Sequence, residues 1–147
     1  MNTQQRPIVG ISMGDPGGIG PEICAKALAQ KEIYELCRPL VVGDADIMAD
    51  AVRFSRLTLD VGARQKVSEA AFRLGEIDVF DLKRLALADL RHKQVTAGQG
   101  RASFEYIAKV IALALAGEID ATVTGPINKA AINAAGYHYA GHTEIYA

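Results

Sequence analysis

The chain has 147 residues, of which 50% are hydrophobic and 22% are charged, a composition typical of a soluble globular protein with one hydrophobic core. The formal net charge of -1 gives no electrostatic reason to expect nucleic acid or an anionic membrane as a partner. The longest apolar run, Val110 to Ala116, is too short to span a bilayer, and the polar segment Met1–Pro7 does not resemble a secretory signal. We therefore expect a cytoplasmic protein whose two cysteines, Cys24 and Cys37, are reduced thiols without metal-ligand spacing.

The first predicted strand is the short apolar run Ile8 to Met13, which lies between Pro7 and a glycine-rich loop over residues 14–22. A helix is predicted from about Glu22 to Ala29, because Pro21 suits a first helical turn and Glu22 complements the helix dipole. Its predicted inner face consists of Ile23, Ala27 and Leu28.

A second strand is predicted over Leu40–Val42, followed by a helix from about Asp46 to Phe54 with Asp44 or Asp46 as its N-cap. The pattern of the middle region is weaker. It predicts strands over Leu57–Val61 and Ile77–Phe80, and helices over Glu69–Leu74 and Lys83–Arg91.

The strongest helical pattern runs from about Ala102 to Ala116. Its apolar face has the spacing of an amphipathic helix, and Glu105 and Lys109 are placed to form an i,i+4 ion pair in water. The face comprises Phe104, Ile107, Ala108, Ile111 and Leu115, widened by Val110, Leu113 and Ala114.

The last predicted elements are a buried strand, Ala121 to Thr124, and a small helix from Lys129 to Ala135 that Gly136 ends. Strands therefore alternate with helices through most of the chain, and the strands are short and rich in Ile and Val. This order predicts an α/β fold with three layers and a largely parallel sheet.

Two glycine-rich segments leave alternatives open. The glycines of residues 14–22 suggest a nucleotide-binding loop, but the segment contains neither the Gly-x-Gly-x-x-Gly nor the Gly-x-x-x-x-Gly-Lys pattern. The alternative is a tight turn between a strand and a helix, and the sequence leaves both open. In this loop Asp15 either orients a ligand or caps the turn. Residues 98–103 nearly match the dinucleotide pattern, but no convincing strand precedes them, which weakens an anion-binding interpretation.

The end of the chain gathers polar groups just after a strand. Gly125-Pro126 ends the strand over residues 121–124, and Asn128 and Lys129 follow at the start of the small helix. Polar groups at the carboxyl end of a parallel strand are the usual arrangement of an α/β active site. Lys129 either pairs with a phosphate or is a solvated surface lysine.

His142, Thr143 and Glu144 form a second polar cluster behind Gly141. A histidine can act in acid–base work or donate a hydrogen bond to a phosphate, and a threonine offers a hydroxyl group. We therefore expect a site at these residues, whereas His92, among charged residues, is expected to be only exposed. The three histidines are scattered and no carboxylate has ligand spacing, so no metal site is expected within this chain.

These residues taken together resemble the 4-hydroxythreonine-4-phosphate dehydrogenase family. The motifs are long and occur in the family's order over nearly the whole chain. They are Met13-Gly-Asp-Pro-Gly-Gly-Ile-Gly-Pro-Glu22, Val95-Thr-Ala-Gly98, Val123-Thr-Gly-Pro-Ile-Asn-Lys129, Asn133-Ala-Ala-Gly136 and Gly141-His-Thr-Glu144.

The resemblance implies a homodimeric NAD-dependent enzyme with a fold similar to that of isocitrate and isopropylmalate dehydrogenases. Such an enzyme oxidises 4-phosphohydroxy-L-threonine in pyridoxal phosphate (vitamin B6) biosynthesis, and the oxo acid then loses carbon dioxide. A divalent metal ion polarises the alcohol oxygen, and the nicotinamide accepts the hydride. His142 and Thr143 match the family's substrate-binding His-Thr pair, while Asp15 and Lys129 match motif positions to which no role is assigned.

One departure from the family is large. Family members are about twice as long, and their metal-binding histidines follow the part that this chain matches. We therefore expect residues 1–147 to form the N-terminal part of the first α/β domain of a two-domain dehydrogenase, without its second domain. By itself this part is expected to bind no catalytic metal, to turn over no substrate and to expose apolar surface.

Two alternatives stay open. Enzymes similar to this family act on 4-phospho-D-threonate, on phosphorylated erythronate or on a dihydrodiol carboxylate, so the full-length protein is alternatively a dehydrogenase of one of these hydroxy acids. A second alternative is a small anion-binding protein without catalytic activity.

Overall fold

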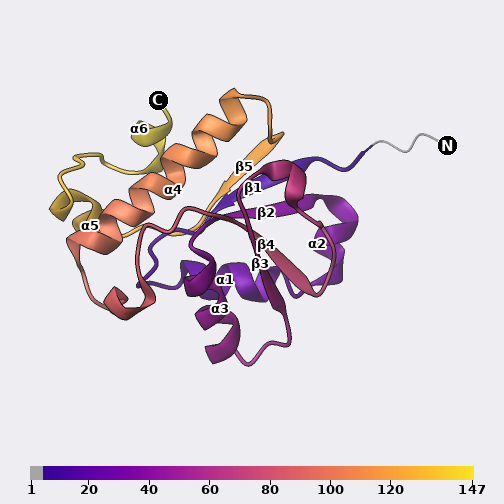
Figure 1. The fold of residues 1–147 in the computed structure, drawn as a ribbon. Coiled ribbons are helices and arrows are strands. Elements are labelled where there is room, and N and C mark those ends of the chain that lie inside the picture. The colour runs from indigo at the N-terminus through magenta and orange to yellow at the C-terminus, as the bar shows by residue number, and fades with distance from the viewer. Residues whose placement is uncertain (1–4) are drawn as a thin grey trace.

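A sheet of five parallel strands forms the centre of the computed structural model, which describes residues 5–147 (Figure 1). The strand order is β3-β4-β2-β1-β5, so the first strand of the chain lies between β2 and β5. The strands are β1 (Ile8–Ser12), β2 (Arg38–Gly43), β3 (Asp60–Arg64), β4 (Glu76–Asp81) and β5 (Ala121–Thr124). This arrangement confirms the predicted α/β fold with a parallel sheet.

Helices cover both faces of the sheet. The helices are α1 (Gly20–Ala27), α2 (Lys31–Leu36), α3 (Ala45–Phe54), α4 (Ala97–Leu115), α5 (Lys129–Ala134) and α6 (His142–Tyr146), with two short 3-10 turns at Val67–Glu69 and Leu87–Asp89. Figure 1 shows α1 and α3 on one side of the sheet and α4 on the other, with α5 and α6 beside α4. None of the helices described is both long and apolar enough to cross a membrane.

The strands supply apolar side chains to both faces because successive side chains point in opposite directions. Val41 of β2 packs with Leu28, which follows α1 directly, and with Met48 of α3, whereas Leu40 and Val42 pack with Val110 of α4 and its neighbours. All of these residues are buried. A strand buried on both faces needs a continuous apolar sequence, which is why the strand at residues 40–42 was recognisable.

Most predicted elements are confirmed, with shifted ends. The strand at 121–124 has the predicted bounds, but the prediction that it is buried is wrong, because β5 is an edge strand of the sheet. The strand predicted at Leu57–Val61 lies at Asp60–Arg64. The helix predicted over Lys83–Arg91 is wrong, since only a 3-10 turn forms at Leu87–Asp89, and the helix predicted over Glu69–Leu74 is wrong as well. Helix α2 was not predicted.

Buried carboxylates explain both wrong helices. Asp78 of β4 accepts hydrogen bonds from the backbone N–H groups of Ala71 (3.0 Å) and Phe72 (2.8 Å). Asp44, at the end of β2, accepts hydrogen bonds from those of Arg84 (2.9 Å) and Leu85 (2.8 Å). Each segment therefore exchanges helical hydrogen bonds for bonds to a buried side chain, which the pattern of apolar residues does not reveal.

The predicted helix faces are partly wrong. In α1 the buried residues include Cys24 and Ala25 beside Leu28, while Ile23 is 47% exposed and Ala27 is also exposed. In α4 the face that packs on β1, β2 and β5 differs from the predicted apolar face, and Leu115, which was predicted to lie on it, is 85% exposed. The buried residues of α4 are Gln99, Gly100, Ala102, Ser103, Tyr106, Ile107, Val110 and Leu113.

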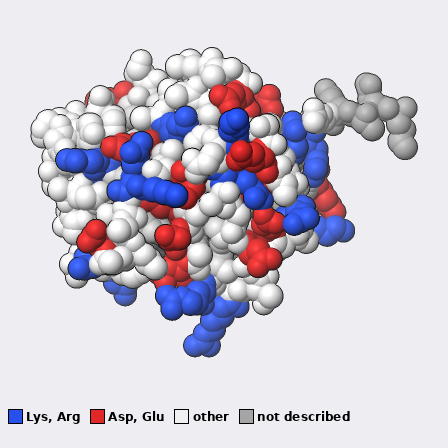
Figure 2. All heavy atoms as spheres, in the orientation of Figure 1, with Lys and Arg blue, Asp and Glu red and all other residues white. Residues whose placement is uncertain are grey.

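The surface ion pair predicted within α4 is also wrong. Glu105 pairs with Arg84, whose Nε lies 2.7 Å from the carboxylate, and Lys109 lies over the ring of Phe80 instead. Figure 2 shows acidic and basic side chains interspersed over the face that it presents. Apolar side chains are also exposed near the β5 edge of the sheet, where Val123 is 51% exposed.

Asp44 joins three parts of the fold. Besides the two backbone N–H groups of the segment after β4, its carboxylate accepts a hydrogen bond from the hydroxyl of Tyr106 on α4 at 2.7 Å. Asp44 is 2% exposed and precedes α3 directly, but its side chain does not cap that helix. The N–H of Ala45 instead donates to Asp81 at 3.1 Å.

We expect Asp44→Ala to lower the free energy of unfolding by about 3 kcal/mol or more, because three buried donors lose their acceptor at once. Urea denaturation followed by circular dichroism measures this change. Asp46→Ala is the matched control, since Asp46 is exposed in the first turn of α3 and its loss costs less than about 1 kcal/mol. Equal effects of the two substitutions would contradict the structural role of Asp44.

Gly100 brings α4 and α5 together. A Cβ atom at this position would overlap the carbonyl oxygen of Ala131 in α5, whereas a Cβ atom at Gly98 would lie 3.7 Å from the nearest atom, Cδ1 of Leu85. The two glycines thus occupy the same helix but different environments.

We expect Gly100→Ala to destabilise the chain by about 1–3 kcal/mol, because the two helix backbones must separate. Gly98→Ala should leave stability unchanged or raise it by up to about 1 kcal/mol, since alanine is the better helix former. Thermal unfolding of the two variants compares them directly. A loss of stability in Gly98→Ala as large as that in Gly100→Ala would show that the helix contact is not the cause.

Candidate functional site

The loops that follow β1 and β5 meet at the carboxyl end of the sheet. The two strands pair in parallel, with Ser12 opposite Thr124, so their following loops emerge side by side. The N–H of Asp15 donates to the carbonyl of Pro126 at 2.9 Å. Gly14 has a φ of +80°, and a Cβ atom there would lie 2.5 Å from the Pro126 oxygen, so only glycine fits this crossing.

The glycine-rich loop after β1 is a tight turn, one of the two predicted alternatives. The carboxylate of Asp15 accepts the N–H of Gly17 at 3.0 Å, and the Asp15 carbonyl accepts the N–H of Gly18 at 3.1 Å. Gly20 packs so closely on the carbonyl of Met13 that a side chain would not fit. Because these backbone donors bond within the turn, the arrangement gives no support to a nucleotide-binding loop of the dinucleotide type.

Asp15 stabilises this turn from a buried position. It is 6% exposed, and burial raises the pKa of its carboxyl group, partly offset by the hydrogen bond from Gly17. The structure therefore shows Asp15 as a cap of the turn, beside the loop that follows β5.

The second glycine-rich segment is part of a helix. Residues 98–100 lie in the first turns of α4, where the hydroxyl of Thr96 accepts the N–H of Gln99 at 3.2 Å. The buried amide of Gln99 accepts the N–H of Arg91 at 2.6 Å and donates to the carbonyl of Gln94 at 2.9 Å. Gln99 thus fixes the segment before α4, and Gly100 permits the contact with α5, so both residues have structural roles.

Asn128 and Lys129 lie at the start of α5 as predicted, and their side chains make different contacts. The side chain of Asn128 accepts the N–H of Ala131 at 3.0 Å and so caps the helix itself. The side chain of Lys129 lies against Gly141, because a Cβ atom on Gly141 would lie 3.6 Å from Cε and 3.8 Å from Nζ of Lys129. The ammonium group is therefore next to the residue that precedes His142.

His142 begins α6 and lies beside the loop after β5. Burial lowers the pKa of its imidazole, and the neighbouring backbone of Gly125 acts in the opposite direction. Its Nε2 atom is inaccessible to solvent, and the contribution of Gly125 to the pKa is that of a hydrogen bond with its backbone. Thr143 is exposed, and Glu144 accepts the N–H of Ala140 at 2.7 Å, which makes Glu144 a structural residue of the turn before α6.

Aromatic stacking holds the segment between α5 and α6 against α4. The ring of Tyr137 stacks on Phe104 with centroids 3.9 Å apart, and Tyr139 lies at 5.6 Å from the same ring. Together with the Gly100 contact, this packing connects α4, α5 and the start of α6. Lys129 and the predicted site residue His142 therefore lie at one end of the sheet, near the turn that contains Asp15.

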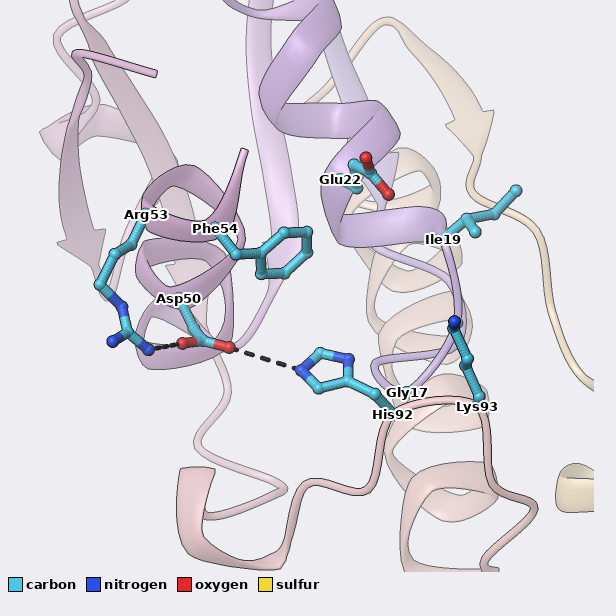
Figure 3. A pocket seen from close by; sticks show the side chains of 9 residues that line it. Gly17, Ile19, Glu22, Asp50, Arg53, Phe54, His92 and Lys93 are labelled. Carbon is cyan, nitrogen blue, oxygen red and sulfur yellow. Dashed lines mark hydrogen bonds and ion pairs between the residues drawn. The ribbon is translucent and has the colours of Figure 1, made fainter. Parts of the chain in front are cut away.

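A separate pocket of about 500 Å³ opens between α1 and α3 (Figure 3). Phe54 reaches into it from α3, and His92 extends from the loop before α4 toward Asp50, with 3.6 Å between Nε2 and the carboxylate. The rings of Phe54 and His92 are nearly perpendicular, at 5.6 Å between centroids. His92 is exposed, as predicted, and it also lines this pocket. Its partners come from distant segments, so no local motif indicated the pocket.

The metal ion implied by the family resemblance does not fit this chain alone. Across residues 5–147 no group of three His, Cys, Asp or Glu side chains lies close enough together to hold a metal ion. His142 approaches the backbone of Gly125 and not a set of carboxylates or imidazoles. A metal-binding step cannot therefore be derived from these side chains.

We expect Asp15→Asn to change the pH dependence of stability. Since burial raises the pKa of Asp15 in the folded chain, the wild type loses stability as the pH rises from about 3.8 through the folded pKa. The variant lacks this loss but keeps an amide oxygen to accept the Gly17 N–H. Between pH 3.8 and the folded pKa of Asp15, the unfolding free energy of the variant should therefore rise relative to that of the wild type. Above the folded pKa the difference between the two proteins should stay constant. Urea denaturation at a series of pH values measures the shift, and a constant difference at all pH values would contradict it.

Comparison with known proteins relates the whole arrangement to one family. The family model described as pyridoxal phosphate biosynthetic protein PdxA matches residues 35–147. A protein of Symbiobacterium thermophilum, provisionally named D-threonate 4-phosphate dehydrogenase, is 48% identical over 96% of this chain and 42% of its own length. A protein of Clostridium botulinum with the same provisional name is 42% identical over 97% of this chain and 42% of its own length.

Solved structures agree with the sequence comparison. A 4-hydroxythreonine-4-phosphate dehydrogenase from Burkholderia phymatum superimposes with a TM-score of 0.94 and 39% identity, covering 97% of this chain and 43% of the other. A terephthalate 1,2-cis-dihydrodiol dehydrogenase from Burkholderia xenovorans superimposes with a TM-score of 0.72 and 29% identity, covering 92% of this chain and 38% of the other. The chain thus spans less than half the length of the relatives it matches. Its relatives are dehydrogenases, and the chain belongs to the PdxA family.

Proposed function

We propose that the chain forms the N-terminal part of the first domain of a dehydrogenase that oxidises a phosphorylated four-carbon hydroxy acid with NAD. The observation that carries this proposal is the match of nearly the whole chain to dehydrogenases of the PdxA family. The cluster of Lys129 and His142 at the carboxyl end of a parallel sheet supports it, because α/β enzymes bind their substrates there.

Among the possible substrates, 4-phospho-D-threonate is favoured. The relatives that carry this substrate in their provisional names are 48% and 42% identical to the chain, whereas the solved 4-hydroxythreonine-4-phosphate dehydrogenases are 39% and 33% identical. The second candidate is 4-phosphohydroxy-L-threonine, which would place the enzyme in pyridoxal phosphate biosynthesis. Both molecules are phosphorylated hydroxy acids, so the same kinds of binding residues suit either substrate.

In this proposal His142 and Thr143 bind the substrate through uncharged groups. Because burial lowers the pKa of His142, the imidazole is neutral near pH 7, so its ring offers one donor and one acceptor. NAD would accept the hydride from the carbinol carbon, while the hydroxyl proton leaves to a base and a carbonyl group forms. A divalent metal ion would require ligands other than a cluster within residues 5–147. The same family resemblance supports a cytoplasmic homodimer.

The test uses the protein as its host makes it, assayed for NADH formation with each phosphorylated substrate and a divalent metal ion. We expect His142→Ala to reduce kcat/KM by about tenfold or more, because a hydrogen bond to a charged substrate is lost. His138→Ala is the matched control, since His138 is exposed four residues earlier in the chain. Absence of NADH formation with both substrates would refute the proposed reaction. Unchanged kinetics in His142→Ala would refute the role of His142 alone.

A further inference from the structure

The pocket between α1 and α3 contains apolar side chains that the fold leaves in contact with water. Ile19 and Phe54 line this cavity of about 500 Å³, and they are 59% and 46% exposed (Figure 3). Binding sites for small molecules have volumes of this order, and they combine apolar walls with a few polar groups. Exposed apolar side chains that meet at one cavity therefore indicate a place where a ligand binds.

Hydrogen bonds hold the loop that forms one wall of the pocket. The N–H of Arg91 donates to the side chain of Gln99 at 2.6 Å, and the N–H of Lys93 donates to the carbonyl of Gly17 at 2.9 Å. Both neighbours of His92 in the chain are thus fixed in place. Because this wall is formed before a ligand arrives, binding costs less entropy than it would at a loop that must first become ordered.

Two charged side chains at the pocket are open to a ligand. Glu22 binds Lys26 through Oε1 at 2.7 Å, and its Oε2 has no hydrogen-bond partner in the part of the chain that the structure describes. The ammonium group of Lys93 has no carboxylate of the described residues within ion-pair distance. The other two charges of the pocket, Asp50 and Arg53, are bonded to each other. The pocket therefore offers a ligand one carboxylate oxygen and one ammonium group.

An aromatic wall, a carboxylate and an ammonium group together match the three parts of a nucleotide. Aromatic side chains stack on bases, carboxylates accept hydrogen bonds from ribose hydroxyls, and lysines bind phosphate groups. The backbone donors of the turn after β1 bond within that turn, so a phosphate group at this place needs a side chain such as Lys93. The pocket is also lined by the residues that follow β1, at the carboxyl end of a parallel sheet, where nucleotides commonly bind.

We propose that this pocket binds the adenosine end of NAD, with adenine against Phe54, ribose at Glu22 and the adjacent phosphate group at Lys93. This inference rests on the proposed function, because it assigns residues of this chain to the cofactor of that reaction. The residues that line the pocket do not include Lys129 or His142, at the proposed substrate site. The pocket therefore suits the end of the cofactor that does not react.

Isothermal calorimetry with adenosine monophosphate (AMP) tests the stacking contact in the protein as its host makes it. We expect Phe54→Ala to bind AMP about 5- to 100-fold more weakly than the wild type, as for a lost stack between a base and an aromatic ring. Leu115→Ala is the matched control, because Leu115 is an exposed apolar residue of α4, on the other face of the sheet. No AMP binding by the wild type, or equal AMP affinity in the wild type and Phe54→Ala, would overturn the inference.

A second pair of variants tests the phosphate contact. Lys93 and Lys83 are both exposed, and both have a positive φ, of +59° and +51°, so replacement by alanine has the same effect on the backbone of either. Lys93→Ala should bind AMP about 3- to 5-fold more weakly and bind adenosine, which lacks the phosphate group, as the wild type does. Lys83→Ala should leave both affinities unchanged. An equal loss of AMP affinity in the two variants would contradict the assignment of Lys93.

Titration with NAD and with nicotinamide mononucleotide separates this inference from the proposed reaction. Phe54→Ala should weaken binding of NAD by the same factor as binding of AMP and leave binding of the mononucleotide unchanged. This result in a protein that forms no NADH would refute the proposed reaction alone. NADH formation together with an unchanged NAD affinity in Phe54→Ala would overturn the assignment of the pocket alone. Thermal unfolding of each variant confirms that it is folded.

Discussion

The buried carboxylate of Asp44 determines how the second half of the chain is arranged. It lies at the end of β2 and is bonded to the segment that follows β4 and to Tyr106 of α4. A carboxylate with so little access to water is stable only when hydrogen bonds replace its hydration, so the segment after β4 is held against the end of the sheet. That restraint places the start of α4, and α4 in turn carries Gly100 and Phe104, on which α5 and the residues before α6 pack. The position of Lys129 and His142 thus depends on a contact made by a residue far from both.

A second buried aspartate also accepts backbone hydrogen bonds from an irregular segment. Asp78 in β4 is 2% exposed and binds the backbone N–H groups of Ala71 and Phe72 together with the guanidinium of Arg64. The irregular segments at residues 70–75 and 82–86 are therefore each organised by an aspartate in or beside a strand of the sheet. A long connection without regular structure can be well ordered when a buried side chain accepts its backbone hydrogen bonds.

The sequence revealed the parts of the fold whose signals are local. Parallel strands such as Leu40–Val42 are buried on both faces and so are continuously apolar, and the end of α5 is marked by Gly136, which has a φ of +94°. The helix expected near residues 83–91 failed because its bonding partner, Asp44, is about forty residues away in the chain. For the candidate site, the motif identified His142, but its contact with Gly125 and the course of the Lys129 side chain follow from packing. The pocket at Phe54 and His92 joins three separate segments and left no pattern to find.

The position of β1 in the sheet has a consequence for how the chain folds. β1 is made first, but it lies between β2 and β5, and Ile8 exchanges hydrogen bonds with Asp120 across more than a hundred residues. Closing such a large loop lowers the chain entropy before the contacts between β1 and β5 can compensate, so folding that depends on this pairing is slow. During synthesis one edge of β1 stays without its partner until β5 has left the ribosome. A nascent chain therefore carries an open strand edge while the residues between β1 and β5 are made, the stage at which a chaperone would have the greatest effect.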